Sequence, residues 1–123
     1  MTRLGELERT VMDILWDAGG RALSGREVAD QLPDRAYTTV LTILDRLRRK
    51  KLVERSDDGK VHVFRAVATR EAYMAELMVQ SLDGARDRSA VLVRFAATVS
   101  PEEAAVLRAA LEGLPHLREA SPR

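Results

Sequence analysis

The chain has 123 residues and a mass of 13.7 kDa, enough for one compact domain or for a small domain with a dependent appendage. Apolar residues make up 46% of it and charged residues 32%, a balance typical of a folded globular protein. The absence of cysteine excludes disulfides and thiolate metal sites, and two histidines are too few for a histidine-rich metal cluster. No apolar run approaches the roughly 20 residues of a membrane span, and the first residues lack a signal-peptide core. We therefore expect a cytoplasmic protein with no cofactor, no metal and no membrane partner.

The net charge of +1 conceals a basic segment. Residues 35–51 contain six arginines and lysines against one acidic residue, a local excess of +5. Such a cluster favours a polyanionic partner for this segment rather than for the whole chain. A solvated helix face is the alternative interpretation.

The spacing of apolar residues predicts three helices in the first half of the chain. Ser24 and Glu27 have the spacing of a capping box at the start of the second helix. After Lys51 the pattern changes to a period of two, and Asp58-Gly59 predicts a tight turn between two short strands. The helices are expected over about residues 4–18, 25–32 and 36–50.

The third of these helices has two contrasting faces. Its apolar stripe is formed by Val40, Ile43, Leu44 and Leu47. Its opposite side collects short hydroxyls and arginines, namely Thr38, Thr39, Thr42, Arg46 and Arg49. Threonine can hydrogen-bond a base edge and contact a thymine methyl, while arginine can clamp a phosphate or a guanine edge. Because threonines are poor helix formers, their presence favours a contact role over an ordinary exposed face.

Helix, short helix, turn, basic helix and hairpin, in this order, follow the plan of a winged helix-turn-helix domain, which we expect over residues 1–67. The third helix would then enter the DNA major groove, and the hairpin would reach an adjacent phosphate. Lys60 at the hairpin turn is a candidate phosphate contact, although a turn lysine is more often only solubilising. His62 is expected to be a packed or partly exposed strand residue rather than a ligand-binding one.

Residues 68–123 are expected to form a mainly helical second domain. Helices are predicted over about 70–83, 89–99 and 101–114, the last beginning at a capping box of Ser100 and Glu103. Their apolar residues lie on several sides, more than one chain can cover, so we expect a twofold homodimer. A monomer whose tail folds back over the first domain is the alternative. The candidate dimer contacts are Tyr73, Leu77, Leu92, Phe95, Val99, Leu107 and Leu111.

Four stretches of the sequence, residues 4–16, 36–47, 50–53 and 59–64, together resemble the BlaI/MecI/CopY family of penicillinase-type repressors. The resemblance implies a homodimeric repressor with an amino-terminal winged helix, a carboxy-terminal dimerisation domain and dyad operators with TACA/TGTA-like half-sites. Carried over by position, Thr38, Thr39 and Thr42 would face bases. The residues expected at the DNA backbone are Tyr37, Arg46, Arg49, Lys50 and Lys60.

The chain departs from this family in two ways. Copper-responsive members carry a cysteine-rich tail, which is absent here. Resistance repressors of the family are inactivated by cleavage of an Asn-Phe bond in the dimerisation domain, and the matching position here is Arg94-Phe95. A sensor-linked protease with a different sequence preference is therefore a candidate partner. Packing of Phe95 in the dimer core is a second interpretation, compatible with the first.

The sequence thus predicts a DNA-binding repressor that acts as a homodimer on a palindromic operator, with derepression by proteolysis in the dimerisation domain. Two alternatives stay open: a regulator with a small-molecule pocket between the domains, and a winged-helix protein–protein adaptor. An enzyme is not expected, because the sequence has no phosphate-binding loop, no nucleophile with a base at a recognisable spacing and no metal-ligand cluster.

Overall fold

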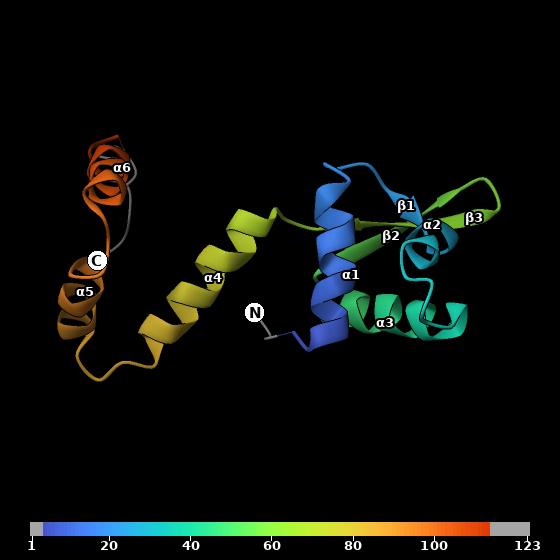
Figure 1. Ribbon diagram of the computed structural model, residues 1–123, viewed down its shortest axis with the longest axis horizontal. Coiled ribbons are helices and arrows are strands. Elements are labelled where there is room, and N and C mark those ends of the chain that lie inside the picture. The colour runs from blue at the N-terminus through green and yellow to red at the C-terminus, as the bar shows by residue number, and fades with distance from the viewer. Residues whose placement is uncertain (1–3, 114–123) are drawn as a thin grey trace. The chain divides into compact units, whose positions relative to one another are not determined.

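The computed structural model describes residues 4–113 of the chain, which divides into two compact units, Met1–Gln80 and Ser81–Arg123 (Figure 1). None of the helices among the described residues is long and apolar enough to cross a membrane. The elements in chain order are α1 (Glu6–Asp17), β1 (Leu23–Ser24), α2 (Gly25–Asp30), α3 (Tyr37–Arg49), β2 (Val53–Asp58), β3 (Val61–Ala66), α4 (Arg70–Asp83), α5 (Arg88–Ala96) and α6 (Pro101–Glu112).

Both predicted capping boxes are confirmed. The Ser24 hydroxyl accepts from the Glu27 N–H at 3.0 Å, and the Glu27 carboxylate accepts from the Ser24 N–H at 2.8 Å, which starts α2. Ser100 and Glu103 repeat the arrangement at 3.1 and 2.8 Å and start α6. In each case side chains satisfy backbone donors that have no partner within the helix. Residue 114, the expected end of the last helix, lies outside the described residues.

The sheet has three antiparallel strands in the order β1-β3-β2. Strands β2 and β3 form the predicted hairpin, with Asp58 opposite Val61, and the turn is made possible by Gly59 in the left-handed region at φ 70°. Strand β1 was not predicted, because two residues are too few to show a periodicity. It pairs with β3 through Leu23 opposite Phe64, which closes the winged helix-turn-helix unit.

The core of the first unit is formed by apolar residues of α1, α2, α3 and the sheet. The predicted stripe of α3 is confirmed, since Val40, Leu44 and Leu47 are 0% exposed and Ile43 is 6% exposed. Burial of this stripe fixes the rotation of α3 about its axis. Its opposite face is therefore turned to solvent.

The first unit extends beyond residues 1–67, the region expected to bind DNA. The beginning of α4 packs against this unit. Tyr73 is 3% exposed, and its ring centroid lies 5.5 Å from that of Trp16 in α1. The Trp16 indole also donates a hydrogen bond to the Ala68 carbonyl at 2.9 Å, which anchors the chain just before α4. Residues up to Gln80 consequently belong to the first compact unit.

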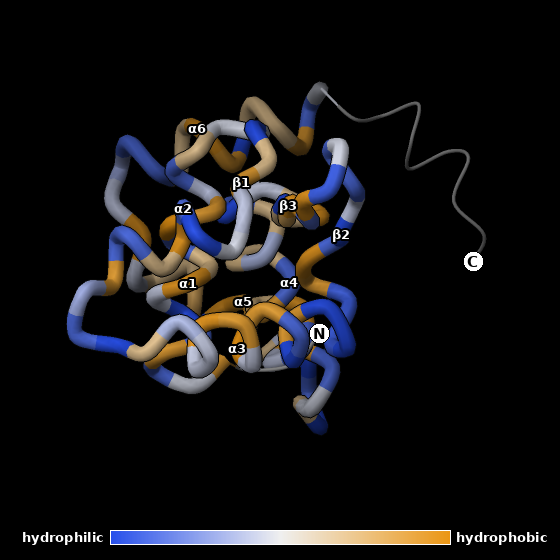
Figure 2. The backbone as a smooth tube through the Cα atoms, turned by 90° about the vertical axis from the view of Figure 1, so that its right-hand side faces the viewer, coloured by the Kyte–Doolittle hydropathy of each residue, from blue (hydrophilic) through white to orange (hydrophobic). Residues whose placement is uncertain are grey.

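The second unit contains α5 and α6, and none of its described residues is buried. Apolar residues, orange in Figure 2, nevertheless recur along both helices. The exposed fraction reaches 69% for Val93 and 70% for Val106. Two short helices with uncovered apolar surface are not expected to be stable alone in water.

Candidate nucleic-acid interface

The face of α3 opposite the core carries the predicted hydroxyl and arginine side chains. The structure leaves all five exposed: Thr38, Thr39, Thr42, Arg46 and Arg49. They share one side of a helix whose other side is packed against α1 and the sheet, so their backbone positions are held by the core. A rigid, solvent-facing set of donors, acceptors and methyl groups has the chemistry required to read base edges.

Thr42 makes a local hydrogen bond that restricts what it can offer to DNA. Its hydroxyl donates to the backbone carbonyl of Thr38 at 3.0 Å, one turn earlier in α3. With this donor occupied, the Thr42 oxygen can still accept from an exocyclic amine, and the γ-methyl can contact a thymine methyl. Thr42 is therefore suited to accept hydrogen bonds and to make apolar contacts.

Asp45 partly neutralises the basic end of α3. Its carboxylate lies 2.9 Å from Arg48 and 3.0 Å from Arg49. The hydrogen bond from Arg48, aided by the charges of both arginines, lowers the pKa of Asp45 against a smaller opposing effect of burial. Arg49 is 79% exposed and can exchange this carboxylate for a phosphate, whereas Arg46 has no ion pair within residues 4–113.

Lys50, expected at the DNA backbone, has an internal partner instead. Its Nζ lies 2.8 Å from both carboxylate oxygens of Glu8, which is 5% exposed, and the Gly5 N–H donates to the same carboxylate at 2.9 Å. A buried carboxylate requires such a compensating cation. Lys50 therefore joins the end of α3 to α1, and we remove it from the predicted phosphate contacts.

The same contacts perturb the titration of Glu8. Burial acts to raise its pKa, but hydrogen bonds from Lys50 and Gly5, together with the charges of Lys50 and Arg46, lower it below the ordinary value of 4.5. Because the folded protein favours the carboxylate, the interaction contributes stability above about pH 4.5 and loses it as the pH falls through the lowered pKa.

Lys60 is exposed at the turn of the β2–β3 hairpin, which is the wing of the fold, but it lies beside two acidic residues. Asp57 and Asp58 precede the turn, so the tip carries more negative than positive charge. His62 is exposed and places Nδ1 2.6 Å from the Asp57 carboxylate across the strand pair. Lys60 stays a candidate phosphate contact, opposed locally by these carboxylates.

Two predicted dimer contacts lie at the core of the first unit. Tyr73 is buried against Trp16 of the same chain, so we correct its assignment from dimer contact to core residue. Leu77, one turn later in α4, is half-buried and packs against the same core. The other five predicted contacts belong to the second unit. Leu92, Phe95, Leu107 and Leu111 are exposed and Val99 is half-exposed.

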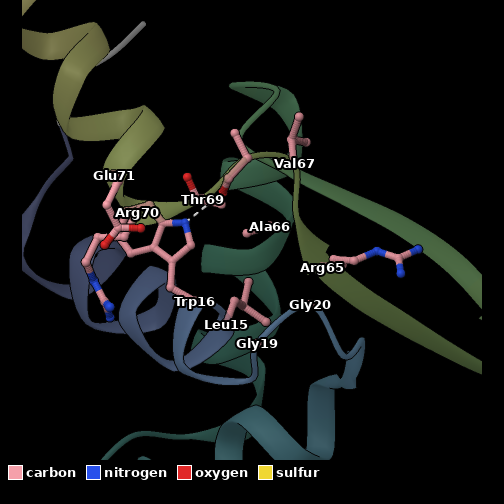
Figure 3. A pocket seen from close by; sticks show the side chains of 11 residues that line it. Leu15, Trp16, Gly19, Gly20, Arg65, Ala66, Val67, Thr69, Arg70 and Glu71 are labelled. Carbon is pink, nitrogen blue, oxygen red and sulfur yellow. Dashed lines mark hydrogen bonds between the residues drawn. The ribbon is translucent and has the colours of Figure 1, made fainter. Parts of the chain in front are cut away.

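A small hollow of about 260 Å³ opens where the end of α1, the Gly19-Gly20 loop, the end of β3 and the start of α4 meet (Figure 3). Arg65 and Arg70 line it, but both are already paired with carboxylates. Arg65 lies 3.4 Å from Glu54, and Arg70 lies 2.9 Å from Asp17. The hollow thus offers no uncompensated charge to an anionic effector, and it is smaller than most ligand pockets. Within residues 4–113 no acidic or histidine cluster could hold a metal ion.

The sequence matches the family described as penicillinase repressor over residues 4–113. The chain belongs to the penicillinase repressor family. Its curated relatives include the transcriptional regulator BlaI of Mycobacterium tuberculosis, in strains CDC 1551 and H37Rv. Each is 43% identical over 120 residues, which span 93% of this chain and 86% of the relative. The family resemblance predicted from the sequence is confirmed.

Solved structures agree on the fold of this penicillinase repressor family member. A MarR family protein from Bacillus stearothermophilus superposes with a TM-score of 0.51 at 22% identity, over 98% of this chain and 78% of that one. A mutant of S. aureus MepR bound to an oligodeoxyribonucleotide gives 0.52 at 20% identity, over 90% and 77% of the two chains. Fold and family together make the chain a transcriptional repressor of the BlaI type with a winged-helix fold, rather than an enzyme.

Proposed function

We propose that this repressor binds a palindromic operator as a homodimer, with one copy of α3 in the major groove of each half-site. The observation that carries the proposal is the exposed face of Thr38, Thr39 and Thr42, flanked by Arg46 and set opposite a fully buried stripe. Threonines supply base contacts, and the arginines supply phosphate contacts that release counterions. Short hydroxyl side chains suit half-sites rich in A·T pairs, in agreement with the TACA/TGTA-like half-sites that the family resemblance implies.

The homodimer is supported by the uncovered apolar surface of the second unit. Leu92, Phe95, Leu107 and Leu111 are between 39% and 54% exposed. Burial of such side chains stabilises by about 25 cal/mol per Å² of apolar surface, which a second copy of the same unit can supply. A twofold axis would also place the two α3 helices at a fixed separation on a palindrome.

Proteolytic derepression would act on the same surface of the second unit. The Arg94-Phe95 bond lies inside α5, and both side chains are exposed in the single chain. Cleavage there would divide an element of the proposed dimer contact and so release the operator. Because a helix does not fit an extended protease cleft, the sensor-linked protease would require local unwinding of α5.

We expect Thr38→Ala combined with Thr42→Ala to weaken operator binding about 10- to 100-fold while random duplex binding changes less than about twofold. The reason is that the threonines contact bases, whereas nonspecific affinity comes from the cations. The measurement is fluorescence anisotropy with a duplex selected from genomic fragments and with a scrambled duplex.

Arg46→Ala is the matched comparison on the same face. It should weaken binding to both duplexes and reduce the slope of log K against log salt by about one. Equal losses on operator and random DNA in the threonine variant would refute base reading by this face. Thermal unfolding provides the folding control, since alanine is a better helix former than threonine.

A further inference from the structure

The first turns of α2 and α3 approach each other closely. Gly25, at the start of α2, is buried, and a Cβ atom at this position would lie 2.6 Å from Leu41 Cδ2 and 3.6 Å from the Tyr37 hydroxyl. The absence of a side chain therefore leaves room for Leu41, while Tyr37, the first residue of α3, lies at ordinary van der Waals distance from the beginning of α2. This contact brings the next residue of α2, Arg26, beside the amino-terminal end of the proposed reading helix.

Arg26 lies over the aromatic ring of Tyr37. Its guanidinium carbon lies 4.1 Å from the centre of the Tyr37 ring, well within the range of a cation–π contact. Tyr37 is 37% exposed and directly precedes Thr38 and Thr39. The guanidinium is thus held in a defined place next to the side chains that face DNA in the proposed function.

Within residues 4–113 two other arginines also lie over an aromatic ring, but each of them has a carboxylate partner. Arg9 and Arg70 both lie over Trp16, at 5.7 and 5.3 Å, and both are paired with Asp13 at 3.4 and 3.3 Å. Arg26 is exposed and, within residues 4–113, has no carboxylate partner. Its positive charge is oriented but not neutralised.

We propose that Arg26, held on the ring of Tyr37, binds a backbone phosphate of the operator at the edge of each half-site. A guanidinium that lies over the ring face keeps its N–H groups free, so they can donate two parallel hydrogen bonds to phosphate oxygens. Tyr37, expected from the sequence to contact the DNA backbone, is in this proposal a positioning residue instead, because its hydroxyl lies beside Gly25 at the beginning of α2 and its ring carries Arg26. The inference rests on the proposed function, because it requires the adjacent face of α3 to meet DNA.

The test compares Arg26→Gln with Arg21→Gln in the full-length protein, on the selected operator duplex and on random duplex over a series of salt concentrations. Arg21 is a matched control, because it is exposed, lies close in sequence and is already paired with Glu27 at 3.4 Å. Arg26→Gln should weaken binding to both duplexes about fivefold to tenfold near 0.1 M salt and reduce the salt slope by about one. Arg21→Gln should change affinity less than about twofold.

Variants of Tyr37 separate the ring from its hydroxyl. Tyr37→Phe keeps the aromatic ring and should retain the DNA affinity and the salt slope. Tyr37→Leu removes the ring and should lower both as much as Arg26→Gln does. The double variant of Arg26→Gln and Tyr37→Leu should bind no more weakly than either single one, because both remove one contact. A loss in Tyr37→Phe equal to that in Tyr37→Leu would overturn the positioning role.

The outcomes distinguish this inference from the proposed function. If the unsubstituted protein binds DNA and Arg26→Gln keeps its affinity and salt slope, the phosphate contact is overturned while the proposed function stands. If the unsubstituted protein shows no salt-dependent binding to any duplex, the proposed function is overturned and the phosphate contact with it.

Discussion

Phe95→Asp should convert the protein into monomers that bind a two-half-site operator about 100-fold more weakly than the unsubstituted chain. Phe95 lies in α5, where no residue is buried by its own chain, and in the proposed dimer a second copy would cover the apolar surface around it. A carboxylate placed in that contact would have to be desolvated without a compensating charge. Sedimentation velocity gives the mass, and an operator titration gives the affinity.

Ser89→Asp is the control for this substitution, because it adds the same charge at an exposed polar residue in the first turn of α5. A carboxylate near a helix amino terminus is favourable, so this variant should keep the mass and the affinity of the unsubstituted protein. Circular dichroism checks that both variants keep their helices. A Phe95→Asp protein that still sediments as a dimer would contradict the assignment of α5 to the dimer contact.

Lys50→Ala should lower the free energy of unfolding by about 2–3 kcal/mol, because it leaves the Glu8 carboxylate buried without its cation. The expected loss is below that for a fully buried pair, since the Lys50 side chain is 25% exposed. The stability difference between the unsubstituted protein and Lys50→Ala should also depend on pH. As the pH falls below about 4.5 and Glu8 becomes protonated in both proteins, the difference between them should shrink. Urea unfolding at pH 7 and in acid measures both effects.

Arg49→Ala, one residue earlier, should give the opposite pattern of effects on stability and DNA binding. Its side chain is 79% exposed and its pair with Asp45 is at the surface, so stability should change by less than about 0.5 kcal/mol. Its DNA affinity and salt slope should fall, whereas the salt slope of Lys50→Ala should stay unchanged. A Lys50→Ala protein of full stability with a reduced salt slope would restore the sequence-based assignment of Lys50 to the DNA backbone.

Features encoded by neighbouring residues could be predicted from the sequence. The apolar stripe of α3 follows from the helical period alone, and the capping box at Ser24 is complete within four residues. The Asp58-Gly59 turn is equally local. Because burial of the stripe determines which side of α3 is exposed, the candidate reading face could be placed as well.

Features that depend on distant partners could not be predicted. Lys50 pairs with Glu8, 42 positions away, and nothing local distinguishes it from the other cations of its run. Tyr73 is buried against Trp16, although its neighbours in α4 read as an exposed apolar face. The contact of Arg26 with the ring of Tyr37 joins two different helices, α2 and α3, and a helical pattern does not encode it.

Hydroxyl-radical footprinting of the complex with the selected operator shows whether two symmetry-related copies of the α3 face read two half-sites. We expect two protected stretches related by a twofold axis, with centres separated by about 10 base pairs or a multiple of it. A single protected stretch without symmetry, or protection that does not depend on sequence, would contradict this expectation.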